Sequence, residues 1–226
     1  MKTILPLCAA ILTCTAAVAQ PQPHHAPRIL EDKPGFHAVF DDDGGRVETF
    51  RRGESARELE FHGGAVIREP LAHVVFLGDW SAHAKHREFL TRELARASSG
   101  SELRHLDFAG VEHPLAFTGV TTLAAGDRVN DLRIQSALAS AVHDGRLAQR
   151  DDNTIFVVFV APGTKATLGD QDGARDYDSY HSHFHAEDVD IHYVVVPYRE
   201  EMAAMVAAAS KSVGRAIINP NGDGWY

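Results

Sequence analysis

Two kinds of apolar pattern alternate along the chain from residue 61 onward. Continuous apolar runs, which are typical of strands buried on both faces, occupy Leu71–Leu77, Thr154–Val160 and residues 191–197. Apolar residues spaced three and four apart, which are typical of helices with one buried face, extend over residues 82–97, 131–147 and 200–217. Strands that alternate with helices of this length predict an α/β fold, a three-layer sandwich with a mostly parallel sheet and a long C-terminal helix.

The pattern before residue 61 is different and divides into two parts. Residues 1–19 begin with a charged Lys2, continue with an apolar run and end in Ala17-Val18-Ala19, which is the pattern of a cleaved signal peptide. Residues 20–60 start as a Pro-rich extended arm and then alternate around an Asp- and Gly-rich turn at 41–45 like a short hairpin. The sequence therefore predicts a signal peptide, an arm with a hairpin, and one α/β domain at residues 61–226.

Cysteine usage and charge fit an exported protein. The two cysteines, Cys8 and Cys14, both lie within the predicted signal peptide, so the mature chain would have no disulfide. Removal of that peptide leaves 21 Lys and Arg against 31 Asp and Glu, a net charge of about −10. This charge argues against nucleic acid and anionic membranes as partners, and no later segment has the ~18 apolar residues of a membrane span. We expect a secreted or periplasmic bacterial protein whose ligand or partner belongs to the cell envelope or the exterior.

The C-terminal helix predicted at residues 200–217 carries the first candidate site. Lys211, Ser212 and Arg215 occupy the i, i+1 and i+4 positions at which helical metalloenzymes place a ligand, a catalytic base and a second ligand. An ammonium and a guanidinium group have no lone pair to offer a cation, so this helix cannot bind zinc in that way. The helix thus has the spacing of a metallopeptidase site without its chemistry.

The residues after this helix give the chain a likeness to a known family. A tight turn with an aromatic pair contains Asn219, Pro220, Gly222, Gly224, Trp225 and Tyr226. Helix and turn together resemble the secreted EXORDIUM-like (phosphate-induced) proteins, whose bacterial members often have a His-Glu-x-x-Glu helix running into Thr-Asp-Pro-x-Gly-x-Gly-Trp-Tyr. The likeness covers roughly residue 61 to the C-terminus, with similar motifs in His-Gly-Gly at 62–64, Leu-Gly-Asp-Trp at 77–80 and Tyr-His-Ser at 180–182.

Taken residue by residue, the resemblance implies a zincin-like helix whose metal site is degenerate. Lys211, Ser212 and Arg215 stand where the family has His, Glu and Glu, and Asn219 stands where it has Asp. The implied protein has no catalytic residues and no bound cofactor, and it acts by binding or interaction. Lys211 and Arg215 then either replace the lost cation by facing acids of residues 176–190, or are surface cations favoured by the helix dipole.

A second candidate site precedes the strand predicted at residues 191–197. His181, His183 and His185 alternate, so an extended backbone would point all three imidazoles to one side. Three converging imidazoles are suitable ligands for Zn²⁺, Cu²⁺ or Ni²⁺, and Glu187 could act as a base. The alternative function is therefore a metal-dependent hydrolase with zinc at this cluster. Against it, only His181 belongs to the Tyr-His-Ser motif, and the other two could lie on a polar loop.

Three other histidines have an ordinary structural explanation. His83 and His86, three apart at the start of a predicted helix, could chelate a metal, but Lys85 and Arg87 beside them favour an exposed helix surface. His73 lies inside an apolar run, where a hydrogen-bonded core histidine is the more frequent case.

The turn at residues 219–224 has the oxygen spacing of half a calcium loop, yet no bidentate acid follows it, which favours a structural turn.

Overall fold

The computed structural model describes residues 59–98, 106, 109–148, 151–186 and 189–226, and the backbone of three N-terminal strands. These strands are β1 (Arg28–Glu31), β2 (His37–Phe40) and β3 (Arg46–Phe50). The predicted signal peptide and Glu187 lie outside the described residues. No helix in the described part of the chain is both long and apolar enough to cross a membrane.

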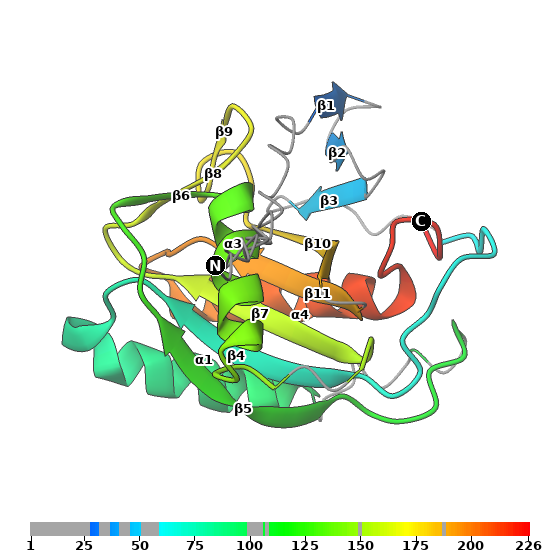
Figure 1. Ribbon diagram of the computed structural model, residues 1–226, viewed down its shortest axis with the longest axis horizontal. Coiled ribbons are helices and arrows are strands. Elements are labelled where there is room, and N and C mark those ends of the chain that lie inside the picture. Colours follow the sequence, from blue (N-terminus) through cyan, green and yellow to red (C-terminus); the bar gives the residue numbers. More distant parts are fainter. Residues whose placement is uncertain are drawn as a thin grey trace, which may run out of the picture.

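An eight-stranded sheet, in the order β1-β2-β3-β10-β11-β7-β4-β5, forms the middle layer of the molecule (Figure 1). Its parallel part contains β5 (Ala116–Leu123), β4 (Leu71–Leu77), β7 (Thr154–Val160) and β11 (Val189–Val196). Strand β10 (Ser179–Ala186) pairs antiparallel with β11 and also with β3. The hairpin predicted in the N-terminal arm is therefore present as β2 and β3, and it extends the same sheet.

Helices cover both faces of this sheet, which makes the three layers that the sequence predicts (Figure 1). On one face lie α1 (Ala84–Ser98), which follows the short 3-10 helix η1 (Ser81–His83), and the closing helix α4 (Met202–Ile218). On the other face lies α3 (Asp131–His143), which ends earlier than predicted. Because β4 is buried on both faces, Val74 and Phe76 join the core under α1 and α4, whereas Val75 and Leu77 join the core under α3.

A small second sheet lies beside the start of α3. It contains β6 (Arg128–Asn130), β8 (Lys165–Leu168) and β9 (Gln171–Asp172), in the order β6-β8-β9. Strand β6 leads directly into α3, and the Asn130 side chain caps that helix by accepting from the backbone N–H of Arg133 at 3.0 Å.

A buried carboxylate joins α3 to the sheet. Asp131 Oδ1 accepts hydrogen bonds from the hydroxyls of Tyr180 and Tyr193, each at 2.7 Å, and its Oδ2 accepts from Gln135 Nε2 at 2.8 Å. Burial, and then the charge of Asp131, raise the pKa of both tyrosines well above its usual value. The two hydroxyls therefore stay protonated and keep donating to Asp131, which fixes β10 and β11 against α3.

The closing turn is held by the segment that enters the domain. Asn219 Oδ1 accepts from the backbone N–H of Gly224 at 2.7 Å, and the carbonyl of Gly224 accepts from the N–H of His62 at 2.9 Å. The His62 ring stacks on Tyr226, with ring centres 3.9 Å apart. These contacts give the Asn219 side chain a backbone partner, as expected of a structural turn.

Candidate functional site

The helix position at which the resemblance expects a glutamate lies buried against β10. Ser212 is fully buried, and its Oγ donates to Ser179 Oγ at 2.7 Å. Ser179 Oγ in turn donates to the backbone carbonyl of Ala208 at 3.1 Å. The two hydroxyls therefore form a short hydrogen-bonded chain between the sheet and α4, and they satisfy each other without a metal.

The two cations of α4 lie in different surroundings. Lys211 is exposed, whereas Arg215 is half-buried, and its charge acts on His181. Of the two alternatives, the one in which both cations point inward therefore does not hold for Lys211. The reason is helical geometry: Lys211 lies two residues before the buried Val213, so the two side chains leave α4 on nearly opposite sides.

Two acids near β10, which are among those that inward-facing cations would meet, form ion pairs with arginines. Asp178 forms an ion pair with Arg199, and Asp176 forms one with Arg175. The exposure of Lys211 favours the second explanation offered by the sequence for that residue, a surface cation in the last turns of α4.

His181 is nearly fully buried between β10 and the end of α4. Its Nε2 lies 3.1 Å from the backbone oxygen of Asn219, and because a carbonyl can only accept, this nitrogen carries a proton. Burial lowers the pKa of His181 to about 4, with the charge of Arg215 acting in the same direction. A neutral imidazole whose Nε2 already donates to a carbonyl does not offer that nitrogen to a metal.

The alternating histidines lie on one face of a strand, as predicted from an extended backbone, and not on a loop. Each has a different neighbour across the antiparallel pairing with β11. His183 lies opposite the buried His192, with ring centres 5.9 Å apart, and His185 Nδ1 lies 3.0 Å from Asp190 Oδ1.

The spacing of these histidines follows from the strand itself. Same-face residues of a strand are separated by about 6.6 Å, whereas zinc–nitrogen bonds are about 2.0–2.1 Å, so a shared ion needs side chains that bend toward one point. The structure instead places each imidazole beside its own partner. Binding of zinc by His181, His183, His185 and Glu187 stays a prediction.

One neighbour in this row was missed from the sequence. His192 lies inside an apolar run, where it looks like any core residue, and only the register with β10 places it opposite His183. Burial lowers the pKa of His192 to about 4 as well.

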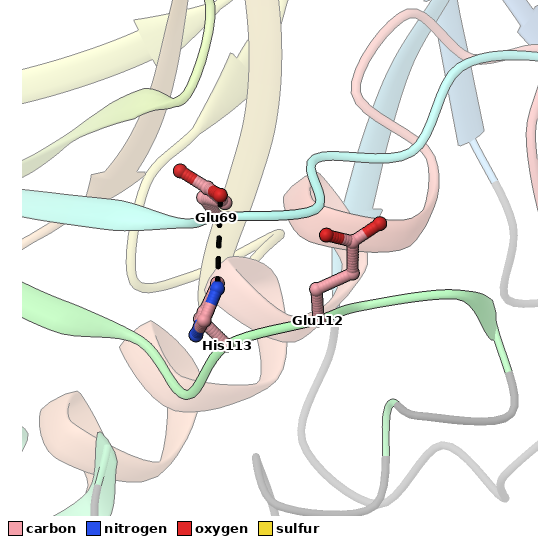
Figure 2. A group of neighbouring side chains, drawn as sticks. All are labelled: Glu69, Glu112 and His113. Atoms are coloured by element: carbon pink, nitrogen blue, oxygen red, sulfur yellow. Dashed lines mark ion pairs between the residues drawn. The ribbon is translucent and has the colours of Figure 1, made fainter.

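A different group of side chains has the spacing of metal ligands (Figure 2). Glu69, Glu112 and His113 each place one ligand atom within 4.8 Å of the others, at the point where the segments before β4 and β5 run side by side. His113 Nε2 lies 3.7 Å from Glu69 Oε1, and both side chains are more than 60 % exposed. Arg68 forms an ion pair with Glu112 at 3.0 Å, which neutralises one of the two carboxylates. Exposed acidic groups of this kind need no bound ion.

A cavity of about 480 Å³ opens at the start of α3, in the size range of small-molecule sites. Its lining includes Arg128, Asn130, Asp131, Arg133 and Thr167. Several of these polar groups already have partners: Asn130 caps the helix, Asp131 accepts from two tyrosines, and Arg133 donates to the carbonyl of Arg128. The cavity is therefore bordered by structural polar contacts.

The expected core histidine is confirmed. His73 Nε2 lies 2.9 Å from Thr121 Oγ1, and its Nδ1 lies 3.3 Å from Thr118 Oγ1. Burial lowers the pKa of His73. A Cβ on Gly119 would lie 3.0 Å from His73 Cε1, so the glycine gives this ring its space.

Comparison with known proteins assigns the chain to no family. No protein-family model matches the chain, and a search of curated proteins finds no relative.

Proposed function

We propose that this chain is an exported, zincin-like protein that resembles the EXORDIUM-like family and acts by binding a ligand or partner, not by hydrolysing peptides. The proposal rests on one observation, the buried hydrogen bond between Ser212 and Ser179. In the family pattern, the residue at position 212 is the glutamate of the metallopeptidase-like helix. Here that position is occupied by a hydroxyl whose partner is another hydroxyl of the protein.

The surroundings of Ser212 support the same proposal. The resemblance motifs come together in space, because His181 of the Tyr-His-Ser segment contacts Asn219 at the end of α4. Among the described residues at this meeting point, the groups are two serine hydroxyls, the Nε2–H of a neutral imidazole and the half-buried guanidinium of Arg215. None of these provides the carboxylate that a zinc peptidase uses as its general base.

Export is the second part of the proposal and is supported by residues 1–19. A charged start, an apolar run and Ala17-Val18-Ala19 predict cleavage before Gln20. The ligand is then expected in the envelope or outside the cell.

The test compares the mature protein, purified after export, with variants of α4 and β10 in a zinc-dependent peptidase assay. We expect the mature protein to begin at Gln20 by mass spectrometry and to cleave fluorogenic peptides no faster than a buffer blank, with or without added Zn²⁺. Ser212→Ala, which keeps the packing but removes the hydroxyl, should leave this result unchanged. Chelator-sensitive cleavage by the wild type that is lost in His181→Gln would overturn the proposal in favour of the metal-dependent hydrolase.

A gain-of-function variant tests whether α4 and its surroundings can still hold a metal ion when the ligands are restored. The triple change Lys211→His, Ser212→Glu and Arg215→Glu restores the family pattern. Because position 212 is fully buried, its new carboxylate lacks a cation, and we expect loss of several kcal/mol of stability without zinc. Recovery of the melting temperature on addition of Zn²⁺ would show that only the ligands have been lost.

A further inference from the structure

The carboxyl ends of β4 and β11 carry a cluster of aromatic and imidazole side chains. Both strands pair in parallel with β7, so they end at the same edge of the sheet with β7 between them. Trp80, just after β4, and Tyr198, just after β11, meet across this gap with ring centres 6.1 Å apart. In open α/β sheets, ligands bind outside the carboxyl ends of the strands.

His83 and His86 lie beside this aromatic pair. The two residues are three positions apart across the junction of η1 and α1, so their side chains share one face. Both are half-buried, and the Tyr198 ring centre lies 6.1 Å from that of His83 and 6.3 Å from that of His86. The cluster therefore holds both imidazoles against one tyrosine while leaving them accessible to solvent.

The separation of the two imidazoles fits a shared ion. Their ring centres are 5.2 Å apart. Two imidazoles bound to one tetrahedral ion through bonds of about 2.0–2.1 Å have ring centres about 5 Å apart. The backbone of the helix start thus already holds the two rings at the distance that chelation requires.

Two carboxylates lie near the imidazole pair. The Tyr198 hydroxyl lies 3.5 Å from His86 Nδ1 and donates to Glu200 Oε2 at 3.4 Å, so the Glu200 carboxylate is one hydroxyl away from His86. Just before η1, Asp79 Oδ1 accepts from the backbone N–H of Ser81 at 2.9 Å, which holds a second carboxylate at the start of the helical segment that carries His83. The two carboxylates add negative charge near the pair of nitrogen donors.

Arg87, one of the two cations that the sequence places beside the imidazole pair, contacts β5 and Phe76. Arg87 Nη2 donates to Thr122 Oγ1 on β5 at 3.0 Å, and its guanidinium lies 4.9 Å from the centre of the Phe76 ring. The Arg87 guanidinium therefore lies between α1 and the sheet.

We propose that His83 and His86 are the two nitrogen ligands of a divalent transition-metal ion of the Cu²⁺ or Zn²⁺ type, and that water completes its coordination. Imidazole nitrogen suits these ions. The site lies at the carboxyl edge of the sheet and uses no residue of α4, so it stands whether or not the closing helix has lost a peptidase function.

Trp80 provides an optical reporter for this site. The chain has two tryptophans, Trp80 and Trp225, so Trp225→Phe leaves Trp80 as the single indole. Because Trp80 packs edge-on against Tyr198, whose ring lies beside both imidazoles, a bound Cu²⁺ ion should quench its fluorescence. We expect quenching by Cu²⁺ to saturate at one equivalent, and Zn²⁺ to reverse or prevent it by competition.

Variants in the Trp225→Phe background separate this site from other histidines. His83→Ala with His86→Ala should weaken Cu²⁺ binding about 100-fold or more, and Glu200→Gln or Asp79→Asn about 10-fold. His113→Ala, in the exposed group with Glu69 and Glu112, is the matched control and should bind like the parent. Far-UV circular dichroism confirms the fold of each variant, and His86→Gln serves if the double variant does not fold. Unchanged binding in the His83 and His86 variants, or loss of binding in the His113 variant, would overturn the proposal.

Discussion

The two most deeply buried histidines of the β10–β11 pair should make the protein lose stability in mild acid. Burial lowers the pKa of His181 and of His192 to about 4, whereas an unfolded chain has histidine pKa values near 6.5. Below pH 6.5 the unfolded chain therefore binds protons that the folded protein does not. Stability contributed by the neutral imidazoles is fully present above pH 6.5 and is lost as the pH falls toward 4.

The size of this loss follows from the two pKa values. From pH 6.5 to pH 5, each histidine lowers the free energy of unfolding by about 1.36 kcal/mol per pH unit. Over these 1.5 pH units the loss is about 2 kcal/mol for each residue and about 4 kcal/mol for the pair. His73, whose pKa burial also lowers, acts in the same direction. Asp79 and Asp172 do not contribute in this window, because their lowered pKa values lie below 3.8. With a urea m-value of about 2 kcal/mol/M, the urea concentration at the midpoint of unfolding should fall by about 2 M.

Urea unfolding at pH 7 and pH 5 measures the effect, with each variant compared to itself at the two pH values. His181→Gln and His192→Gln should each remove about half of the loss, and the double variant should remove most of it. His185→Gln is the matched control, because His185 lies on the same face of β10 but is exposed. A double variant that loses as much stability as the wild type between pH 7 and pH 5 would refute the assignment to buried imidazoles.

Two further substitutions test the packing described above by urea unfolding at pH 7. A Cβ on Gly224 would press on the backbone oxygens of Ile218 and Ala65, the latter at 2.8 Å, so Gly224→Ala should cost about 3 kcal/mol. Gly126→Ala, with no atom within 4 Å of its Cβ, should be near neutral, and similar losses in both would contradict the close approach at the closing turn. Asp131→Ala removes the acceptor for the buried hydroxyls of Tyr180 and Tyr193 and should cost about 3 kcal/mol or more, whereas Asp131→Asn keeps an acceptor and should cost less. Equal losses for the two Asp131 variants would argue against this hydrogen-bonded network.

The candidate sites show where local pattern stops being informative. The alternation of His181, His183 and His185 correctly predicts one strand face, because the side-chain period of a strand is a local property. It does not predict that His192 lies opposite His183, since the pairing of β10 with β11 sets that contact. Likewise, the spacing of Lys211 and Arg215 places both on α4, but the way α4 packs on the sheet leaves Lys211 exposed.

The sequence by itself determined the fold class, because apolar runs and helical stripes are dictated by which faces of each element are buried. It also determined the chemistry that α4 cannot perform, since Lys211 and Arg215 lack lone pairs wherever they point. Only the tertiary structure decided which groups meet. Strand order brings Trp80 and Tyr198 together from positions 118 residues apart, and α4 brings Ser212 to Ser179. Such contacts depend on register and packing between distant segments, which no local pattern of residues encodes.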